Sequence, residues 1–259
     1  MYYGCKKEVD DRRDYKSYVC SAKTNDFPDK YEIMMPSVKD QGIVNSCVAH
    51  SLSTFLEETY KQDKMEFSTG FIYGYRPLGY SQDEGMYPRE AMKTLLKVGD
   101  VPKHNFDHNK ELPEIKKLVD ENFKSLQLIA ELYKIDSYSR IYTEKEIKKC
   151  IFNDIAVPIS IPVYNDLQYD KDTFIIQGPC GKLNGYHMMI IYGYNEHGWL
   201  VQNSWGKDWA NGGRAILPYG YPLDTAWAID TLNNNVVTYT TIWQKIYVLI
   251  LRIIDYFKK

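Results

Sequence analysis

Cys47 is the residue of this sequence whose type and position best fit a nucleophile. Apolar side chains recur at helical spacing after it, which predicts a helix over residues 47–61 that begins at the cysteine, with Asn45 or Ser46 as its N-cap. The first turn of a helix presents unpaired N–H groups and a positive dipole end, and both stabilise a thiolate. A buried, unreactive cysteine is the alternative, because most free cysteines are of that kind.

A histidine and an asparagine that could serve such a nucleophile follow much later. His187 stands in Gly-Tyr-His at the start of an apolar segment, and Asn203 ends another apolar segment in Asn-Ser-Trp-Gly. An imidazole can accept a thiol proton, and an asparagine oxygen can bind one ring nitrogen and so select the tautomer. Trp205 would shield that hydrogen bond from water. Taken singly, the histidine could be structural and the Asn-Ser-Trp-Gly sequence only a turn.

These segments together resemble the active-site segments of the papain-like cysteine peptidases (C1 family). The first is Asp-Gln-Gly-Ile-Val-Asn-Ser-Cys-Val-Ala, which ends two residues after Cys47, and the others are Gly-Tyr-His-Met-Met-Ile and Asn-Ser-Trp-Gly-Lys-Asp-Trp. Gln41 precedes Cys47 by six residues, His187 follows Cys47 by 140, and Asn203 lies 16 further along. The resemblance extends over residues 30–230.

The resemblance implies a role for each of these residues. Cys47 would attack the peptide carbonyl, and His187 would pair with the thiolate and then protonate the leaving amine. Asn203 would orient His187 beneath Trp205. Gln41 would supply one donor of the oxyanion hole, with the backbone N–H of Cys47 as the other.

The sequence departs from the common pattern of the family around the nucleophile. Asn45 and Val48 stand where a glycine and an aromatic residue are usual, which is more similar to the bacterial and viral branch than to the lysosomal cathepsins. The counterpart of the glycine-rich substrate loop is Asp-Glu-Gly ending at Gly85, where the glycine could let a substrate backbone approach or could serve only a turn. Gly185 is the second glycine expected to contact substrate.

The resemblance also implies a fold of the α+β class, with a helical lobe, a lobe built on an antiparallel β-sheet or barrel, and the active-site cleft between them. The expected helices span residues 47–61, 88–98 and 113–125, with a short one after Thr143, where Thr143 and Glu146 have the spacing of a capping box. The expected strands cover residues 157–163, 187–192, 199–203 and 214–217. We therefore expect a catalytic domain over 31–235, with lobes at 45–126 and 127–235.

Both ends of the chain are expected to differ from this domain. Residues 1–30 are polar and irregular, and because a long propeptide of the cathepsin type is not seen before Cys47, we expect this extended segment to lie near the cleft and partly occlude it. Residues 240–259 predict an amphipathic helix with a wide apolar face. Its residues 241–259 could pack on the catalytic domain, mediate self-association or bind a membrane surface.

The composition excludes several other classes of protein. The 32 basic and 34 acidic side chains nearly balance, so nucleic acid is not an expected partner. A cytoplasmic location is the default, because the N-terminus lacks the apolar run of a secretory signal. The five cysteines include no Cys-x-x-Cys pair, and neither a metal nor a cofactor is expected. In an oxidising compartment Cys150 could pair with Cys180, or Cys5 with Cys20.

The sequence and the resemblance together predict a cysteine endopeptidase that acts on peptide or protein substrates through an acyl-enzyme. His50, one turn beyond Cys47, is expected to pack rather than to act as the base. Two alternatives stay open. The chain could be a peptide-trimming or amide-transferring relative, or a catalytically silent pseudo-peptidase that only binds peptides.

Overall fold

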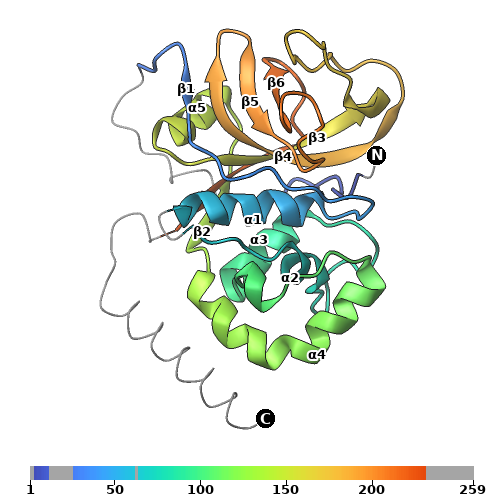
Figure 1. Cartoon of the computed structure of the whole chain (residues 1–259). Helices are drawn as coiled ribbons and strands as arrows, with labels where there is room; N and C mark the ends of the chain where they lie inside the picture. Colours follow the sequence, from blue (N-terminus) through green and yellow to red (C-terminus); the bar gives the residue numbers. More distant parts are fainter. Residues whose placement is uncertain (1–2, 12–25, 62–63, 232–259) are drawn as a thin grey trace.

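The computed structural model describes residues 3–11, 26–61 and 64–231, in which strands and one helix lie on one side and the other helices on the opposite side (Figure 1). The strands are β1 (Tyr31–Glu32), β2 (Ser137–Arg140), β3 (Val157–Tyr164), β4 (Leu183–Asn195), β5 (Gly198–Gln202), β6 (Arg214–Pro218) and β7 (Thr225–Asp230). The α-helices are α1 (Cys47–Thr59), α2 (Thr69–Gly74), α3 (Pro88–Lys97), α4 (Leu112–Ala130) and α5 (Glu144–Phe152). The expected α+β class is confirmed.

The strands form one antiparallel sheet in the order β2-β7-β3-β4-β5-β6, with β1 paired to β4. The sequence allowed either a sheet or a barrel. The sheet has two free edge strands, so it is not closed into a barrel. β3 is buried from Val157 to Val163, which suits its run of apolar and β-branched residues. β4 lies between β3 and β5, and its register places His187 opposite Ile161. The strand that carries His187 is thus held along both edges.

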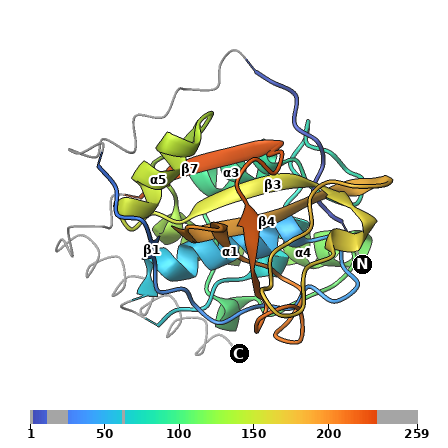
Figure 2. The same cartoon turned by 90° about the horizontal axis from the view of Figure 1, so that it is seen from above.

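Helix α1 lies between the sheet and helices α2, α3 and α4 (Figure 1), whereas α5 packs against β1, β3 and β4 (Figure 2). Every residue from Cys47 to Glu58 is buried, including polar ones that an exposed helix would turn to solvent. The Ser51 hydroxyl donates to the backbone oxygen of Met188 at 3.0 Å, which joins α1 to β4 one residue from His187. The packing of α1 therefore relates the two predicted catalytic residues in space.

Most of the expected elements are present with small shifts of their ends. The capping box at α5 is confirmed, with the Thr143 hydroxyl accepting from the backbone N–H of Glu146 and the Glu146 carboxylate accepting from that of Thr143. β4 is longer than expected and begins before Gly185, so His187 lies inside the strand rather than at its start. Helix α2 and strands β2 and β7 had not been expected, because each is short and its sequence lacks a strong period.

Neither of the two disulfide pairings considered from the sequence is formed. Cys150 forms a disulfide bond, whereas Cys5, Cys47 and Cys180 are free. The amphipathic helix expected over residues 240–259 lies outside the described residues, and the domain boundaries stay a prediction. Among the described residues, no helix is long and apolar enough to cross a membrane.

The burial of α1 can be tested by truncating two leucines. Leu52 of α1 has no exposed surface, whereas Leu128 of α4 is 45% exposed. Leu52→Ala should lower the free energy of unfolding by about 2–5 kcal/mol because it leaves a cavity. Leu128→Ala should cost no more than about 1 kcal/mol. Urea denaturation followed by fluorescence measures both, and equal losses would contradict the central position of α1.

Candidate active site

Cys47 is the first residue of α1, as predicted, and its side chain is completely buried. Burial raises the pKa of the Cys47 thiol to about 11, although the backbone N–H groups of Met188 and Gly4 act in the opposite direction. Ser46 occupies the N-cap position, but its hydroxyl lies 3.1 Å from a ring nitrogen of His50 and does not cap the helix. In this arrangement the neutral thiol is favoured.

His187 and Asn203 are brought together as predicted, with 2.7 Å between Nε2 and Oδ1. Asn203 Oδ1 also accepts from the backbone N–H of Ser204, so the oxygen faces the ring and Nε2 carries the proton. Nδ1 of His187 is buried and has no hydrogen-bond partner among the described residues. Burial lowers the pKa of His187 to about 4, so the ring is neutral. Because Asn203 binds Nε2, Nδ1 is the nitrogen left to exchange a proton.

Trp205 covers this pair, as expected. Its ring centroid lies 4.4 Å from that of His187, with an angle of 33° between the planes. A large apolar ring at this distance keeps water away from the hydrogen bond between His187 and Asn203, which strengthens the bond.

Gln41 is fully buried beside the start of α1. Its side-chain nitrogen donates to the backbone oxygen of Val44 at 2.9 Å, and its side-chain oxygen accepts from the Ser204 hydroxyl at 2.7 Å. The backbone N–H of Gln41 also donates to the backbone oxygen of Ser204, at 2.8 Å. The loop before Cys47 is therefore fastened to the residue that follows Asn203.

The chain's own N-terminal segment, defined here as residues 3–9, passes close to the end of α1 at which Cys47 stands (Figure 1). The backbone oxygen of Gly4 accepts from Met86 at 2.7 Å, and the N–H of Lys6 donates to the oxygen of Met86 at 2.9 Å. Cys5 thereby pairs with Met86 in parallel and with Tyr186 of β4 in antiparallel fashion. The segment bridges the two sides of the molecule, with Gly4 against Asn45, and therefore lies near Cys47 as expected. That it occludes the cleft stays a prediction.

Gly85 and Gly185, the two glycines expected to contact substrate, both face this segment. Gly85 has φ of +80°, and a Cβ there would come within 2.7 Å of the Gly4 oxygen. A Cβ at Gly185 would lie 3.2 Å from that of Tyr3. Gly85 thus allows a close backbone approach, which Gly4 makes here, whereas Gly185 leaves room for the side chain of Tyr3.

An ion pair that the sequence did not reveal anchors the segment further along. The Glu8 carboxylate accepts from the Arg89 guanidinium at 2.7 Å and from the Arg89 backbone N–H at 2.6 Å. That N–H belongs to the first turn of α3, where the helix dipole favours an anion. Glu8 and Arg89 are 81 residues apart, and no local pattern in the sequence links them.

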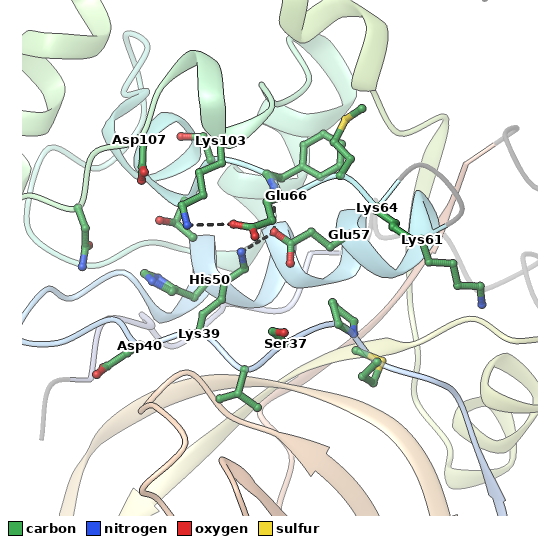
Figure 3. A pocket seen from close by; sticks show the side chains of 18 of the residues that line it. Ser37, Lys39, Asp40, His50, Glu57, Lys61, Lys64, Glu66, Lys103 and Asp107 are labelled. Carbon is green, nitrogen blue, oxygen red and sulfur yellow. Dashed lines mark hydrogen bonds and ion pairs between the residues drawn. The ribbon is translucent and has the colours of Figure 1, made fainter.

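A separate cavity of about 870 Å³ lies beside α1, and its lining includes none of Cys47, His187 and Asn203 (Figure 3). Lys39 forms an ion pair across it with Glu57 of α1. Because Lys39 lies two residues before Gln41, this pair holds the loop that leads to the nucleophile.

His50 also lines this cavity and packs as expected. Its ring nitrogen Nδ1 lies 3.0 Å from the backbone oxygen of Ser46, and burial lowers the pKa of His50 to about 4. It is therefore a neutral, structural histidine.

The sequence matches a known family over most of its length. Residues 22–220 match the family described as "Papain family cysteine protease". The chain is 28% identical over 195 residues to cathepsin L 3 of Paramecium tetraurelia, covering 73% of this chain and 57% of that protein. It is 26% identical over 213 residues to a peptidase C1-like protein of Acanthamoeba polyphaga mimivirus, covering 74% of this chain and 67% of that one.

The fold is also similar to that of a solved structure. Xylellain, a cysteine protease from Xylella fastidiosa, superposes with a TM-score of 0.77 at 24% identity. The match covers 89% of this chain and 96% of the other. At this identity the likeness concerns the fold alone.

Docking of the N-terminal segment should control the reactivity of Cys47. In Gly4→Val the branched side chain cannot fit, because even a Cβ would lie 1.9 Å from the Asn45 oxygen. Iodoacetamide should then alkylate Cys47 at pH 7 at least about tenfold faster than in the unchanged chain, since an exposed thiol ionises more readily. Mass spectrometry reads the rate, with the exposed Cys180 as internal reference.

Val9→Ala is the matched control, because Val9 is 76% exposed within the same segment. It should leave the alkylation of Cys47 unchanged. Equal rates in all three chains would mean that the segment does not protect the thiol.

Proposed function

Because the chain belongs to the papain family of cysteine proteases, we propose that it cleaves peptide bonds of peptide or protein substrates through a thioester on Cys47. The observation that carries the proposal is the hydrogen bond between His187 and Asn203, held beneath Trp205 on the strand that α1 contacts. A nucleophile at a helix start, a base and a group that orients the base form the set that this chemistry needs.

In this mechanism, Nδ1 of His187 takes the proton of the Cys47 thiol, and the sulfur attacks the peptide carbonyl. The C–N bond then breaks as His187 gives the proton to the leaving amine. Water, deprotonated by the same nitrogen, releases the acyl group from Cys47. Asn203 keeps Nε2 occupied throughout. Gln41 and the backbone N–H of Cys47 would donate to the oxygen that becomes negative in the tetrahedral intermediate.

The N-terminal segment would act as an inhibitor of this activity. While it is docked, burial raises the pKa of Cys47 to about 11 and lowers the pKa of His187 to about 4, so both groups are neutral at pH 7. Displacing the segment would return water to the site and remove the penalty that burial puts on charge at both groups.

The direction of the segment would protect it from cleavage. The leaving amine takes its proton from His187, so the leaving-group half of a substrate lies beside His187 and Trp205. The acyl half then lies toward Met86. Tyr3 is on the first side and Cys5 on the second. The segment therefore runs through the site in the opposite chain direction to a substrate. None of its peptide bonds would have its carbonyl and amide groups oriented toward Cys47 and His187 as those of a substrate are.

No contact among the described residues favours the amide-transferring, peptide-trimming or silent alternatives over hydrolysis. Profiling the Gly4→Val chain on a peptide library would separate them. Hydrolysis within peptides, lost in Cys47→Ala, supports the proposal. Cleavage restricted to chain ends would support trimming, and binding without turnover would support a silent relative.

The role of Gln41 can be tested by a substitution that keeps its shape. Gln41→Glu retains an oxygen that can accept from Ser204 but replaces the amide donor by a carboxylate. In a Gly4→Val background kcat should fall by about 100-fold to 1000-fold with little change in KM, because the donor acts in the transition state. An unchanged kcat would remove Gln41 from the oxyanion hole, and the melting temperature checks that the variant is folded.

Inhibition by the N-terminal segment should weaken in mild acid. The pKa of His187 is about 4 in the docked form and, with water readmitted, should approach its ordinary value of 6.5. Below pH 6.5 an undocked form in which Cys47 keeps its thiol proton therefore binds one proton more than the docked form, and falling pH favours it. The activity ratio of Gly4→Val to the unchanged chain should be well above one at pH 7 and fall by about tenfold toward pH 5. A ratio of one at both pH values would show that the segment does not inhibit.

A further inference from the structure

Tyr3 occupies a site of its own beside the catalytic histidine. Its ring meets those of Trp205 and His187 edge-on, with centroid distances of 6.1 and 6.4 Å. Its hydroxyl donates to Oδ1 of Asp166, and the side-chain amide of Asn184 donates to the same oxygen at 3.3 Å. The protein thus contacts both the ring and the hydroxyl of Tyr3.

Asp166 belongs to an unusual turn directly after β3. Asn165, Asp166 and Leu167 have φ of 44°, 60° and 53°, values that residues other than glycine rarely adopt. Buried Leu167, 2% exposed, holds the turn against the protein. Strain of this kind persists only where the surrounding structure imposes it and often marks functional sites. In this turn the backbone places the Asp166 carboxylate where the hydroxyl of Tyr3 reaches it while the Tyr3 ring contacts Trp205.

The position of Tyr3 relative to Cys47 identifies the half of a substrate that would meet this site. Gly4 lies against the backbone of Asn45, two residues before Cys47, and its N–H lowers the pKa of the Cys47 thiol, so Tyr3 is one residue from the place of attack. It lies on the side of His187 and Trp205, where the leaving amine departs. A substrate side chain that follows the scissile bond would reach the same surface.

We propose that Trp205, Asp166 and Asn184 form a subsite that selects tyrosine immediately after the scissile bond, with Tyr3 occupying it in the resting chain. The inference rests on the proposed peptidase activity and adds a preference that this activity does not require. The aromatic ring contacts Trp205, and the hydroxyl donates to the carboxylate of Asp166. Phenylalanine keeps the first contact and loses the second, so the hydroxyl decides between them.

Peptides that differ only in the residue after the scissile bond test this preference. With the Gly4→Val chain, kcat/KM should be about tenfold higher for tyrosine than for phenylalanine, as expected for one hydrogen bond to a charged acceptor. Both should exceed alanine. Equal values for tyrosine and phenylalanine would overturn the proposal.

Two substitutions at Asp166 assign the preference to its side chain. Asp166→Gly suits a φ of 60° and removes the acceptor, so the ratio of tyrosine to phenylalanine should fall to about one. Asp166→Asn tolerates the same backbone and keeps a neutral oxygen, so the ratio should lie between those of the other two chains. A ratio that persists in Asp166→Gly would show that the carboxylate does not read the hydroxyl.

A second readout needs no catalysis and separates this inference from the proposed function. Tyr3→Phe should speed alkylation of Cys47 by about tenfold in the otherwise unchanged chain, and by less than about twofold when Asp166→Gly is also present. Cys180 again serves as the reference. If no peptide is cleaved, the proposed function fails, and this coupling alone decides the subsite. Equal effects of Tyr3→Phe in both backgrounds would refute it.

Discussion

The complete burial of α1 is the constraint on which the other features of this molecule depend. A helix with no exposed face must be enclosed on every side, and here β3 and β4 on one side and α2 and α3 on the other enclose it. That enclosure sets the N-terminal end of α1, and with it Cys47, against the middle of β4. Two side-chain hydrogen bonds hold this arrangement in place. Ser51 joins α1 to β4, and Gln41 joins the preceding loop to Ser204.

The same burial sets the charge state of the catalytic groups. A thiolate and an imidazolium are both penalised where water is excluded, and the N-terminal segment completes that exclusion. The hydrogen bonds that hold the segment in place run to Met86 on one side, and it pairs with Tyr186 on the other. The residues suited to receive a substrate backbone are thus satisfied by the chain itself. The proposed inhibition and the proposed recognition of substrate therefore use the same surface.

The N-terminal segment is held at points that have separate functions. The Glu8 carboxylate binds Arg89 at the positive end of the α3 dipole. This contact would hold the segment in place independently of the other side chains of the segment. The contact of Tyr3 with Asp166 depends on one particular side chain. The first kind of contact gives affinity, and the second gives selectivity, because only a tyrosine hydroxyl reaches that carboxylate while its ring meets Trp205.

Several features of the molecule follow from the sequence alone, because they depend on neighbours along the chain. Helical periodicity after Cys47 placed the nucleophile at a helix start, and the capping box at Thr143 marked the beginning of α5. The spacing of Cys47, His187 and Asn203 predicted a catalytic set through its resemblance to a known family, and the structure brings His187 and Asn203 together. Short elements without a period, such as β7, were not predicted, and His187 was placed at a strand's start rather than inside it.

Only the tertiary structure decided the features that join distant residues. The sheet is open rather than closed, and Cys150 is bonded while Cys5 and Cys180 are free. Tyr3 meets Asp166 across 163 residues of sequence. Such contacts leave no local pattern, because they arise when packing around α1 brings separate segments together. The sequence determined which residues could do the chemistry, and the packing decided what lies over them.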